Sequence, residues 1–475
     1  MNSPNIIATQ QAVPFAVTQP DRIPKQRYYD KEFYDLECEK LWTRVWQMAC
    51  RLEEIPNPGD FVVYNNLDLS IIITRIDEHT VKAYHNACRH RGAQLCKDRG
   101  NKVGGFICPY HGWAWNIEGK NTHVHAPELF DRGSLDPDDL KLRECRLETW
   151  GGCAFINLDD NAPSLRESIE PFAAMHDEWH VDALRVEWWQ AAKLPCNWKL
   201  AMEAFQEAYH VMQSHPQLMP PGVKRTDLGY QRVGKEFPMA RYWTLMKNPP
   251  PFDPKMYFEG SMIGMKLLSE GMKGMTHAKD VRIAESLRDV VQLPPDDPIK
   301  AGETWFRALH SAVVEDNRKK GIDIPDLNEV MDHDMLNAVN FCFPNFFLLP
   351  TLSSASCYRI RPLGPEECLF EIWSLTRYEE GEQPPQIKTP TPVAPDDPEL
   401  PLISRQDFSN VVGQQKGLHS PGFESMRLSQ EVEGVISNNH RMIDGYLAGL
   451  GYERLLPALQ KVSGPIDVPI ADLEL

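Results

Sequence analysis

The arrangement of four residues constrains this chain more than any other feature of its sequence. Cys88, His90, Cys108 and His111 lie in the segment HNACRHRGAQLCKDRGNKVGGFICPYHGW. The pattern is Cys-x-His, seventeen further residues, and then Cys-x-x-His. Thiolates and imidazoles are both ligands of transition metals. The segment therefore predicts two loops that come together around one metal centre.

Two kinds of metal centre use two Cys and two His ligands. A structural zinc ion is one, but zinc sites usually pair Cys with Cys and His with His at short spacing. A [2Fe–2S] cluster of the Rieske type is the other, with two Cys on one iron and two His on the second. Neutral imidazoles make that cluster less negative and raise its potential to about −150 to +300 mV. The mixed pairs favour the cluster, and zinc remains the alternative.

A second set of candidate ligands lies in NWKLAMEAFQEAYHVMQSHP, which starts at residue 197. Read as one long helix, this segment places Glu203, Glu207 and His210 on one face. His215 follows His210 by five residues, and Pro216 disfavours helical geometry at the residue before it. The helix is therefore expected to end or bulge there, which lets His215 lie beside His210.

Two imidazoles and one carboxylate form the facial triad of non-haem Fe(II) oxygenases, which leaves coordination positions open for O₂. Taken alone, the segment also fits an ordinary amphipathic helix with surface acids and imidazoles. The Cys/His segment upstream favours the iron site, because a Rieske cluster needs an electron acceptor.

Length and charge restrict the other possibilities. The chain has 475 residues, enough for two or three domains, and a formal net charge of −17. This charge argues against a nucleic-acid partner, which would need a basic face. The sequence contains no run of about 18 apolar residues, so no membrane span is expected.

The cysteines and the N-terminal residues indicate the cellular compartment of the protein. The eleven cysteines are scattered and odd in number, which suits a reducing compartment rather than a disulfide framework. No basic residue precedes Arg22, so the start does not look like a signal peptide. We expect a cytoplasmic protein.

The patterning predicts an α+β chain in three parts. Residues 1–46 form an arm and an amphipathic helix that Asp30 caps. Residues 47–160 form a β-rich domain that carries the cluster, with strands near 61–64, 71–74 and 81–84. Residues 161–475 form a catalytic domain in which helices cover an antiparallel sheet.

Over nearly its whole length the chain resembles the catalytic α subunits of Rieske non-haem iron ring-hydroxylating oxygenases. CRHRGA is similar to the CPHRGA of that family, and CPYHGW and NWKL…E…YH…H resemble its second cluster loop and its iron-binding helix. The resemblance implies that the cluster ligands are Cys88, His90, Cys108 and His111.

The resemblance also implies that mononuclear Fe(II) is held by His210, His215 and a distant Asp. The matching residue is Asp407, in Ser404-Arg-Gln-Asp407-Phe. Ser-x-x-Asp is also the pattern of a capping box, which is the structural alternative. The other candidate carboxylates are Glu203, Glu207 and Asp334.

Glu207 departs from the family pattern, which commonly has Asp at this position. In the family that carboxylate joins the iron site to a cluster His of the neighbouring subunit, and the match here is His111. Glu occurs at this position in relatives that oxidise quaternary amines such as carnitine. The departure weakens the expectation of an aromatic substrate, but not of an oxygenase. The alternative role for Glu207 is an acid that only orients a ligand or faces solvent.

The resemblance implies an oxygenase trimer, α₃ or α₃β₃, in which electrons cross between subunits. The chain has no dinucleotide-binding fingerprint, so electrons from NAD(P)H would come through a separate reductase, with or without a ferredoxin. The leading reaction is cis-dihydroxylation of an aromatic ring with O₂. Monooxygenation, including O- or N-demethylation and quaternary-amine cleavage, is the second reading. A third, of another class, is an electron-transfer or zinc-structured protein without catalysis.

Overall fold

The structure is a computed structural model that describes residues 12–218, 225–232, 242–247, 251–333, 339–382, 384–465 and 469–475. Its contacts divide the chain into two compact units. Trp42–Leu165 form the smaller unit, and the residues up to Leu41 together with Arg166–Leu475 form the larger unit. Tyr28 and Phe33 are fully buried, so the N-terminal arm contributes to the core of the larger unit.

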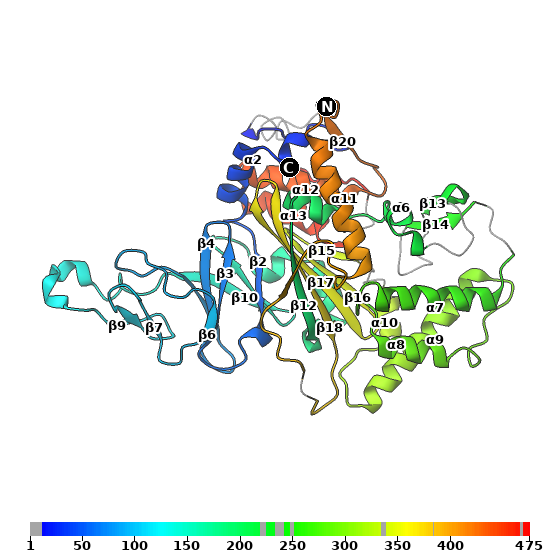
Figure 1. Cartoon of the computed structure of the whole chain (residues 1–475), viewed down its shortest axis with the longest axis horizontal. Coiled ribbons are helices and arrows are strands. Elements are labelled where there is room, and N and C mark those ends of the chain that lie inside the picture. Colours follow the sequence, from blue (N-terminus) through cyan, green and yellow to red (C-terminus); the bar gives the residue numbers. More distant parts are fainter. Residues whose placement is uncertain are drawn as a thin grey trace. The chain divides into compact units, whose positions relative to one another are not determined.

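The smaller unit is built on a seven-stranded antiparallel sheet in the order β2-β11-β10-β5-β4-β3-β6 (Figure 1). A three-stranded sheet, β7-β8-β9, accompanies it. The three predicted strands are confirmed as β3, β4 and β5. The bounds are β2 Gln47–Arg51, β3 Asp60–Asn66, β4 Leu69–Arg75, β5 Val81–His85, β6 Arg99–Asn101, β7 Phe106–Ile107, β8 Ala114–Trp115, β9 Asn121–His123, β10 Glu144–Trp150 and β11 Cys153–Asn157, with short helices η3 Leu52–Glu54, η4 Pro127–Leu129 and η5 Arg132–Leu135.

Alternating residues of the smaller sheet feed two separate cores, as the two-residue period of a strand requires. On β3, Val62 packs into one core and Val63 into the other. The core that receives Val63 also contains Cys88 and Cys108. One face of the sheet therefore packs against the two cysteine loops.

The larger unit contains a seven-stranded sheet in the order β19-β12-β18-β17-β16-β15-β21. Its strands pair antiparallel, except that β12 and β19 are parallel. This confirms the predicted α+β class with an antiparallel sheet in the second domain. The bounds are β12 Arg185–Leu194, β15 Asn340–Cys342, β16 Phe346–Thr351, β17 Ser354–Gly364, β18 Glu367–Thr376, β19 Thr391–Val393 and β21 Gly464–Pro465, and two small pairs are β1 Arg22–Pro24 with β20 Ser425–Arg427 and β13 Leu228–Arg232 with β14 Tyr242–Met246.

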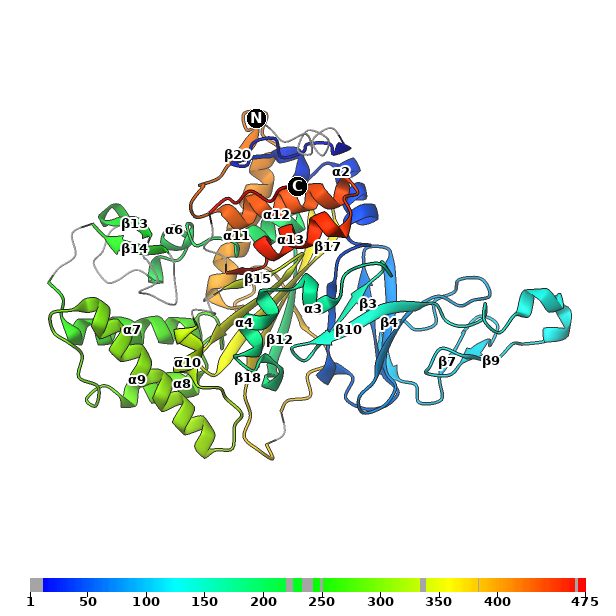
Figure 2. The same ribbon diagram turned by 180° about the vertical axis from the view of Figure 1, so that it is seen from behind.

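Helices gather at both ends of this sheet. In both views α2, α12 and α13 lie together at one end, and α7 to α10 lie together at the other (Figures 1 and 2). The bounds are η1 Lys25–Tyr28, α2 Lys31–Leu36, η2 Glu37–Leu41, α3 Leu165–Ser168, α4 Phe172–Asp177, η6 Val181–Ala183, α5 Trp198–Glu203, α6 Val211–Ser214, η7 Pro216–Leu218, η8 Arg225–Asp227, α7 Pro254–Glu270, α8 Ala278–Ser286, α9 Pro298–Lys319, α10 Leu327–Asp332, α11 Leu402–Leu418, α12 Gly434–Leu447 and α13 Tyr452–Val462.

The start of α2 is as predicted. The side chain of Asp30 accepts a hydrogen bond from the backbone N–H of Phe33 at 2.8 Å, which satisfies one of the free donors of the first turn. The helical segment ends at Leu41 rather than continuing to Trp46, because the chain must enter β2 at Gln47. In the part of the chain that is described, no helix combines the length and the apolar character that crossing a membrane requires.

Candidate metal sites

Cys88 and Cys108 begin two loops of the same design. The backbone N–H of each Cys donates to the carbonyl five residues later, at 2.8 Å in both loops. Gly92 and Gly112, each four residues after its Cys, donate back to the Cys carbonyl at 2.9 and 3.1 Å. Their φ angles are +75° and +71°, a region that residues with a side chain rarely adopt. Gly92 and Gly112 therefore close the two loops that present the ligands.

The four predicted cluster residues come together between these loops. Cys88 and Cys108 are both buried and form no disulfide. The ring centroids of His90 and His111 lie 4.7 Å apart, and Trp113 stacks on His90 at 4.8 Å. Burial and then a hydrogen bond with the Cys108 thiol raise the pKa of Cys88. The structure thus places two thiols and two imidazoles at one site.

The His90 ring has an unpartnered nitrogen and a lowered pKa, two properties that suit a metal ligand. Its Nδ1 is buried and, among the described residues, has no hydrogen-bond partner. A buried polar atom without a hydrogen-bond partner costs about 1–3 kcal/mol, unless a metal ion or another group binds it. Burial, then His111 and Arg91, lower the pKa of His90 and so favour the neutral imidazole, the form that coordinates. These donors fit a Cys₂His₂ [2Fe–2S] cluster.

The second ligand segment is not the single long helix that the sequence predicted. α5 ends at Glu203, and α6 begins only at Val211. The carboxylate of Glu207 accepts a hydrogen bond from the backbone N–H of His210 at 3.0 Å. Such a side-chain-to-backbone bond competes with the helical pattern. Glu203, Glu207 and His210 therefore do not share one helical face.

The predicted iron ligands nevertheless converge. His210 precedes α6 and His215 follows it, with ring centroids 5.4 Å apart. α11 brings Asp407 from a distant part of the chain. Asp407 Oδ1 lies 3.1 Å from His215 Nε2 and 3.5 Å from His210 Nε2. One ligand atom of each residue lies within 4.8 Å of the others, a group that can hold a metal ion.

Hydrogen bonds at the far nitrogens orient both imidazoles. His210 Nδ1 lies 2.6 Å from Glu207 Oε1, and His215 Nδ1 lies 2.8 Å from Gln406 Oε1. An Nδ1–H that donates in this way leaves the lone pair on Nε2, which both rings direct to Asp407. Sequence reasoning missed Gln406, because no motif marks it beyond its place before Asp407.

The electrostatics of this site favour a cation. Burial lowers the pKa of His210, but hydrogen bonds to Asp407 and Glu207 outweigh burial and raise it to about 10. The carboxylates that stabilise a proton here would equally stabilise a divalent ion, since metal and proton compete for the same imidazole.

The alternatives to an Asp407 ligand were a capping box and three other carboxylates. Asp407 and Ser404 are buried inside α11, whose N-cap is Pro401, so the capping-box interpretation is wrong. Glu203 contacts Tyr28 and His440 instead of the metal group. Glu207 contacts His210. Asp334 lies outside the described residues.

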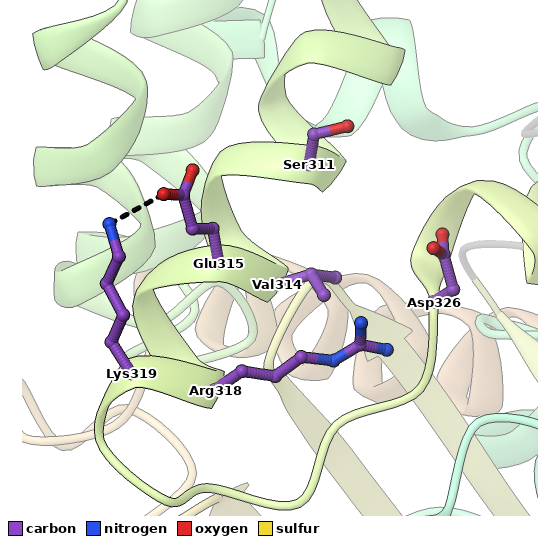
Figure 3. Close-up of a pocket in the computed structure, with 6 residues that line it drawn as sticks. All are labelled: Ser311, Val314, Glu315, Arg318, Lys319 and Asp326. Carbon is purple, nitrogen blue, oxygen red and sulfur yellow. Dashed lines mark ion pairs between the residues drawn. The ribbon is translucent and has the colours of Figure 1, made fainter.

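A cleft of about 410 Å³ opens beside the triad. Its wall includes carboxylates besides Asp407, and one arginine: Glu203, Glu207, Glu433 and Arg427. Another hollow of about 490 Å³ lies between α9 and the start of α10 (Figure 3). There Lys319 pairs with Glu315 at 2.6 Å on an exposed surface, and no predicted site residue lies among its lining residues.

Comparison with known families supports the two predicted cofactors. The family model for the ring hydroxylating alpha subunit (catalytic domain) matches residues 176–449, more than half of the chain. The chain belongs to this family. A model of the Rieske [2Fe–2S] domain matches residues 45–131, which include both cysteine loops. These matches confirm the predicted cofactors, a Rieske [2Fe–2S] cluster and mononuclear non-haem iron, over the zinc alternative.

Individual relatives of this alpha subunit include two types of enzyme. It is 27% identical to the glycine betaine monooxygenase oxygenase subunit of Pseudomonas aeruginosa over 45% of this chain and 49% of that protein. It is 29% identical to the benzene 1,2-dioxygenase subunit alpha of Pseudomonas putida over 46% of this chain and 50% of that protein. The matches thus span about half the length of these relatives.

A solved structure shows the same fold. A quaternary ammonium Rieske monooxygenase in complex with its substrate L-carnitine superposes with a TM-score of 0.57 at 16% identity. The superposition covers 91% of this alpha subunit and 99% of that chain.

Proposed function

We propose that this alpha subunit is the terminal oxygenase of a Rieske non-haem iron system. It uses O₂ and electrons from NAD(P)H, delivered by a reductase with or without a ferredoxin, to hydroxylate an organic substrate. The convergence of His210, His215 and Asp407 beside a cleft carries this proposal. When bound, the cluster supplies electrons and Fe(II) activates O₂ at the positions that a facial triad leaves open.

Each proposed ligand has a physical role. The Nε2 atoms of His210 and His215 are neutral donors, and Asp407 offsets part of the 2+ charge. Glu207 and Gln406 hold the two rings in the orientation that coordination requires. Cys88 and Cys108 are the thiolate ligands of the cluster, and His90 and His111 are the imidazole ligands.

Two reactions are compatible with this site. cis-Dihydroxylation of an aromatic ring is the first, and the likeness to benzene 1,2-dioxygenase supports it. Monooxygenation, such as demethylation or quaternary-amine cleavage, is the second. Glu207 and the likeness to glycine betaine monooxygenase support this second reaction.

The proposal includes an assembly. In an α₃ or α₃β₃ trimer, Glu207 would join His210 to the His111 of a neighbouring copy, so that electrons cross between subunits. The contact of Glu207 with His210 supports one half of this bridge. Residues 47–160 would carry the cluster and residues 161–475 the iron. The cysteines of the described residues, none of which forms a disulfide, support a cytoplasmic location.

Isotope labelling tests the function. The purified protein, reconstituted with a reductase and NAD(P)H under ¹⁸O₂, is given panels of aromatic, phenolic-ether and betaine substrates. Two labelled oxygens in one product indicate dihydroxylation, and one labelled oxygen in the product with one in water indicates monooxygenation. Fully loaded protein that forms no labelled product from any panel would support the non-catalytic reading instead.

A further inference from the structure

Glu203 lies between the iron cleft and a buried group of polar side chains. It lines the cleft together with His210 and Asp407. On its other side, Glu203 Oε1 lies 2.9 Å from the Tyr28 hydroxyl and 2.8 Å from His440 Nε2. Those two atoms are 2.9 Å from each other. The carboxyl therefore lines the cleft and also contacts buried side chains of the protein interior.

The proton positions in this group follow from Arg27. Its Nε lies 3.0 Å from His440 Nδ1, and a guanidinium can only donate. His440 Nδ1 is therefore the acceptor, and a neutral His440 carries its hydrogen on Nε2. Burial, then Arg27 and Lys199, lower the pKa of His440, which keeps the ring neutral. Burial raises the pKa of Tyr28 well above its usual value, so the phenol keeps its hydrogen.

Tyr28 and His440 are thus both donors to the same oxygen of Glu203. Both contacts are made to Oε1. They leave Oε2 as the atom that carries a proton when the carboxyl is neutral.

The charges of the buried group indicate that Glu203 is neutral. Arg27 forms an ion pair with Asp444, and Lys199 Nζ lies 2.7 Å from Glu37 Oε1. Among the described residues of this group, each cation has a carboxylate of its own, and Glu203 has only neutral hydrogen-bond donors. A buried carboxylate without a counter-ion is costly and takes up a proton instead. Burial raises the pKa of Glu203 to about 8, against the Tyr28 hydrogen bond and the charge of Lys199.

The other charged groups around Glu203 come from every element that packs near it. Glu433, just before α12, is an acid and adds to the rise in the Glu203 pKa. The titratable or charged groups of the interior are Arg27, Tyr28, Glu37, Lys199, His440 and Asp444, and those of the cleft are Glu207, His210, Asp407, Arg427 and Glu433.

We propose that Glu203 is a proton donor to the iron cleft, a neutral carboxylic acid that gives up its Oε2 proton in each turnover. This inference rests on the proposed oxygenase function. Oxygenation with O₂ and two electrons from the reductase consumes two protons, whether the product is a diol or an alcohol and water. Glu203 supplies one of them: its O–H bond breaks, an O–H bond to an O₂-derived oxygen forms, and solvent returns a proton to the carboxylate.

Tyr28 and His440 act as positioning residues in this scheme. Their hydrogen bonds to Oε1 stabilise the carboxylate that remains after proton transfer. They also hold the carboxyl in one orientation through its Oε1 atom.

Infrared spectroscopy of the holoenzyme tests the protonation without any turnover. We expect the difference between wild type and Glu203→Gln to contain the carbonyl band of a protonated carboxyl at neutral pH. This band should disappear as the pH rises through about 8. The matched control is Glu433→Gln, another acid of the same cleft, which should keep the Glu203 band. The band should titrate at a somewhat lower pH in this variant, because Glu433 no longer adds to the rise in the Glu203 pKa. No such band in the difference spectrum would overturn the proposal.

Turnover tests the use of the proton. The wild-type rate should fall as the pH rises through about 8, because only the protonated acid can donate. Glu203→Gln should lose about 10²- to 10⁴-fold in rate, the usual contribution of a general acid, and should show no such fall with pH. An infrared band together with an unchanged rate in this variant would overturn the donor role.

Tyr28→Phe provides a test that does not depend on the folding of the Glu203 variant. Losing one donor to the carboxylate should raise the pKa of Glu203, so the infrared titration and the fall in rate both move to higher pH. A purely structural role for Tyr28 predicts a lower melting temperature with neither shift. If the fully loaded wild type oxygenates no substrate, the proposed function fails together with the donor role, while the infrared band still reports the acid.

Discussion

The two metal sites hold their imidazoles in different ways. In the cluster loops, His90 leaves Nδ1 without a hydrogen-bond partner in the described structure, and burial, then His111 and Arg91, lower its pKa. At the triad, the Nδ1 atoms of His210 and His215 are already bonded, and the Nε2 atoms face the Asp407 carboxylate.

The two pairs of histidines differ because a Rieske cluster and an Fe(II) ion bring different charges to their ligands. A Rieske cluster brings negative charge of its own in two thiolates and its inorganic sulfides, so neutral imidazoles suit its second iron. Fe(II) brings a 2+ charge to two neutral imidazoles, and carboxylates must offset it. The Asp407 carboxylate beside His210 and His215 therefore fits Fe(II), and the two thiols beside His90 and His111 fit a Rieske cluster.

The largest expected effect is in the cluster loops. Cys108→Ala removes a thiolate that no other group replaces, so the visible absorption of the cluster and all product formation should be lost. Iron at the triad should remain, because its ligands are elsewhere. Absorption spectra and iron per chain check this. Cys96→Ala is the control, a buried free cysteine of the same core. Equal bleaching in both variants would indicate loop collapse instead of ligand loss.

Asp407→Ala tests the carboxylate at the other site. Two imidazoles alone leave the charge of Fe(II) uncompensated, so triad iron and product should be lost while the cluster absorption stays. Iron content, absorption and product yield measure this. Ser404→Ala, on the same helix and also buried, should keep its iron. Near-normal product from Asp407→Ala would remove this residue from the ligand set.

Glu207→Gln should have an intermediate effect. The amide keeps one acceptor for His210 Nδ1 but loses the charge and the second oxygen, so both metals should stay bound while turnover slows by about 10- to 100-fold. The rate at which the reduced cluster is reoxidised in the presence of substrate and O₂ locates the defect. Wild-type activity would exclude the bridging role, and loss of triad iron would make Glu207 a ligand.

The smallest effect should come from a position that serves neither site. Asp30→Ala removes the N-cap of α2 and should lower the free energy of unfolding by about 1 kcal/mol. Metal content and turnover should not change. Thermal unfolding gives the comparison with Asp35→Ala, which breaks the exposed pair with Lys31 and should lower the melting temperature less, because solvent screens an exposed ion pair. A loss of either metal in Asp30→Ala would show that α2 supports a site directly.

The cluster loops could be predicted from sequence because their determinants are local. The Cys and His spacing names the ligands, and Gly92 and Gly112 permit the turns that present them. Strands β3 to β5 were predictable for the same reason, since alternation along a strand is visible in the sequence.

The iron site needed more than local patterns. Helical spacing predicted one long helix, but the Glu207 carboxylate binds the His210 backbone and interrupts it. Only resemblance to a family pointed to Asp407, because the fold brings α11 to α6. Gln406 and the contacts of Glu203 with Tyr28 and His440 come from tertiary packing, which no spacing encodes.

The central claim is that this alpha subunit holds two separate iron sites, and metal analysis of His210→Ala tests it most directly. We predict about three iron and two acid-labile sulfide per chain in the wild type. In His210→Ala we predict about two of each, an unchanged cluster spectrum and no turnover. Loss of the cluster spectrum in a folded His210→Ala variant, or zinc in place of iron and sulfide in the wild type, would contradict the claim.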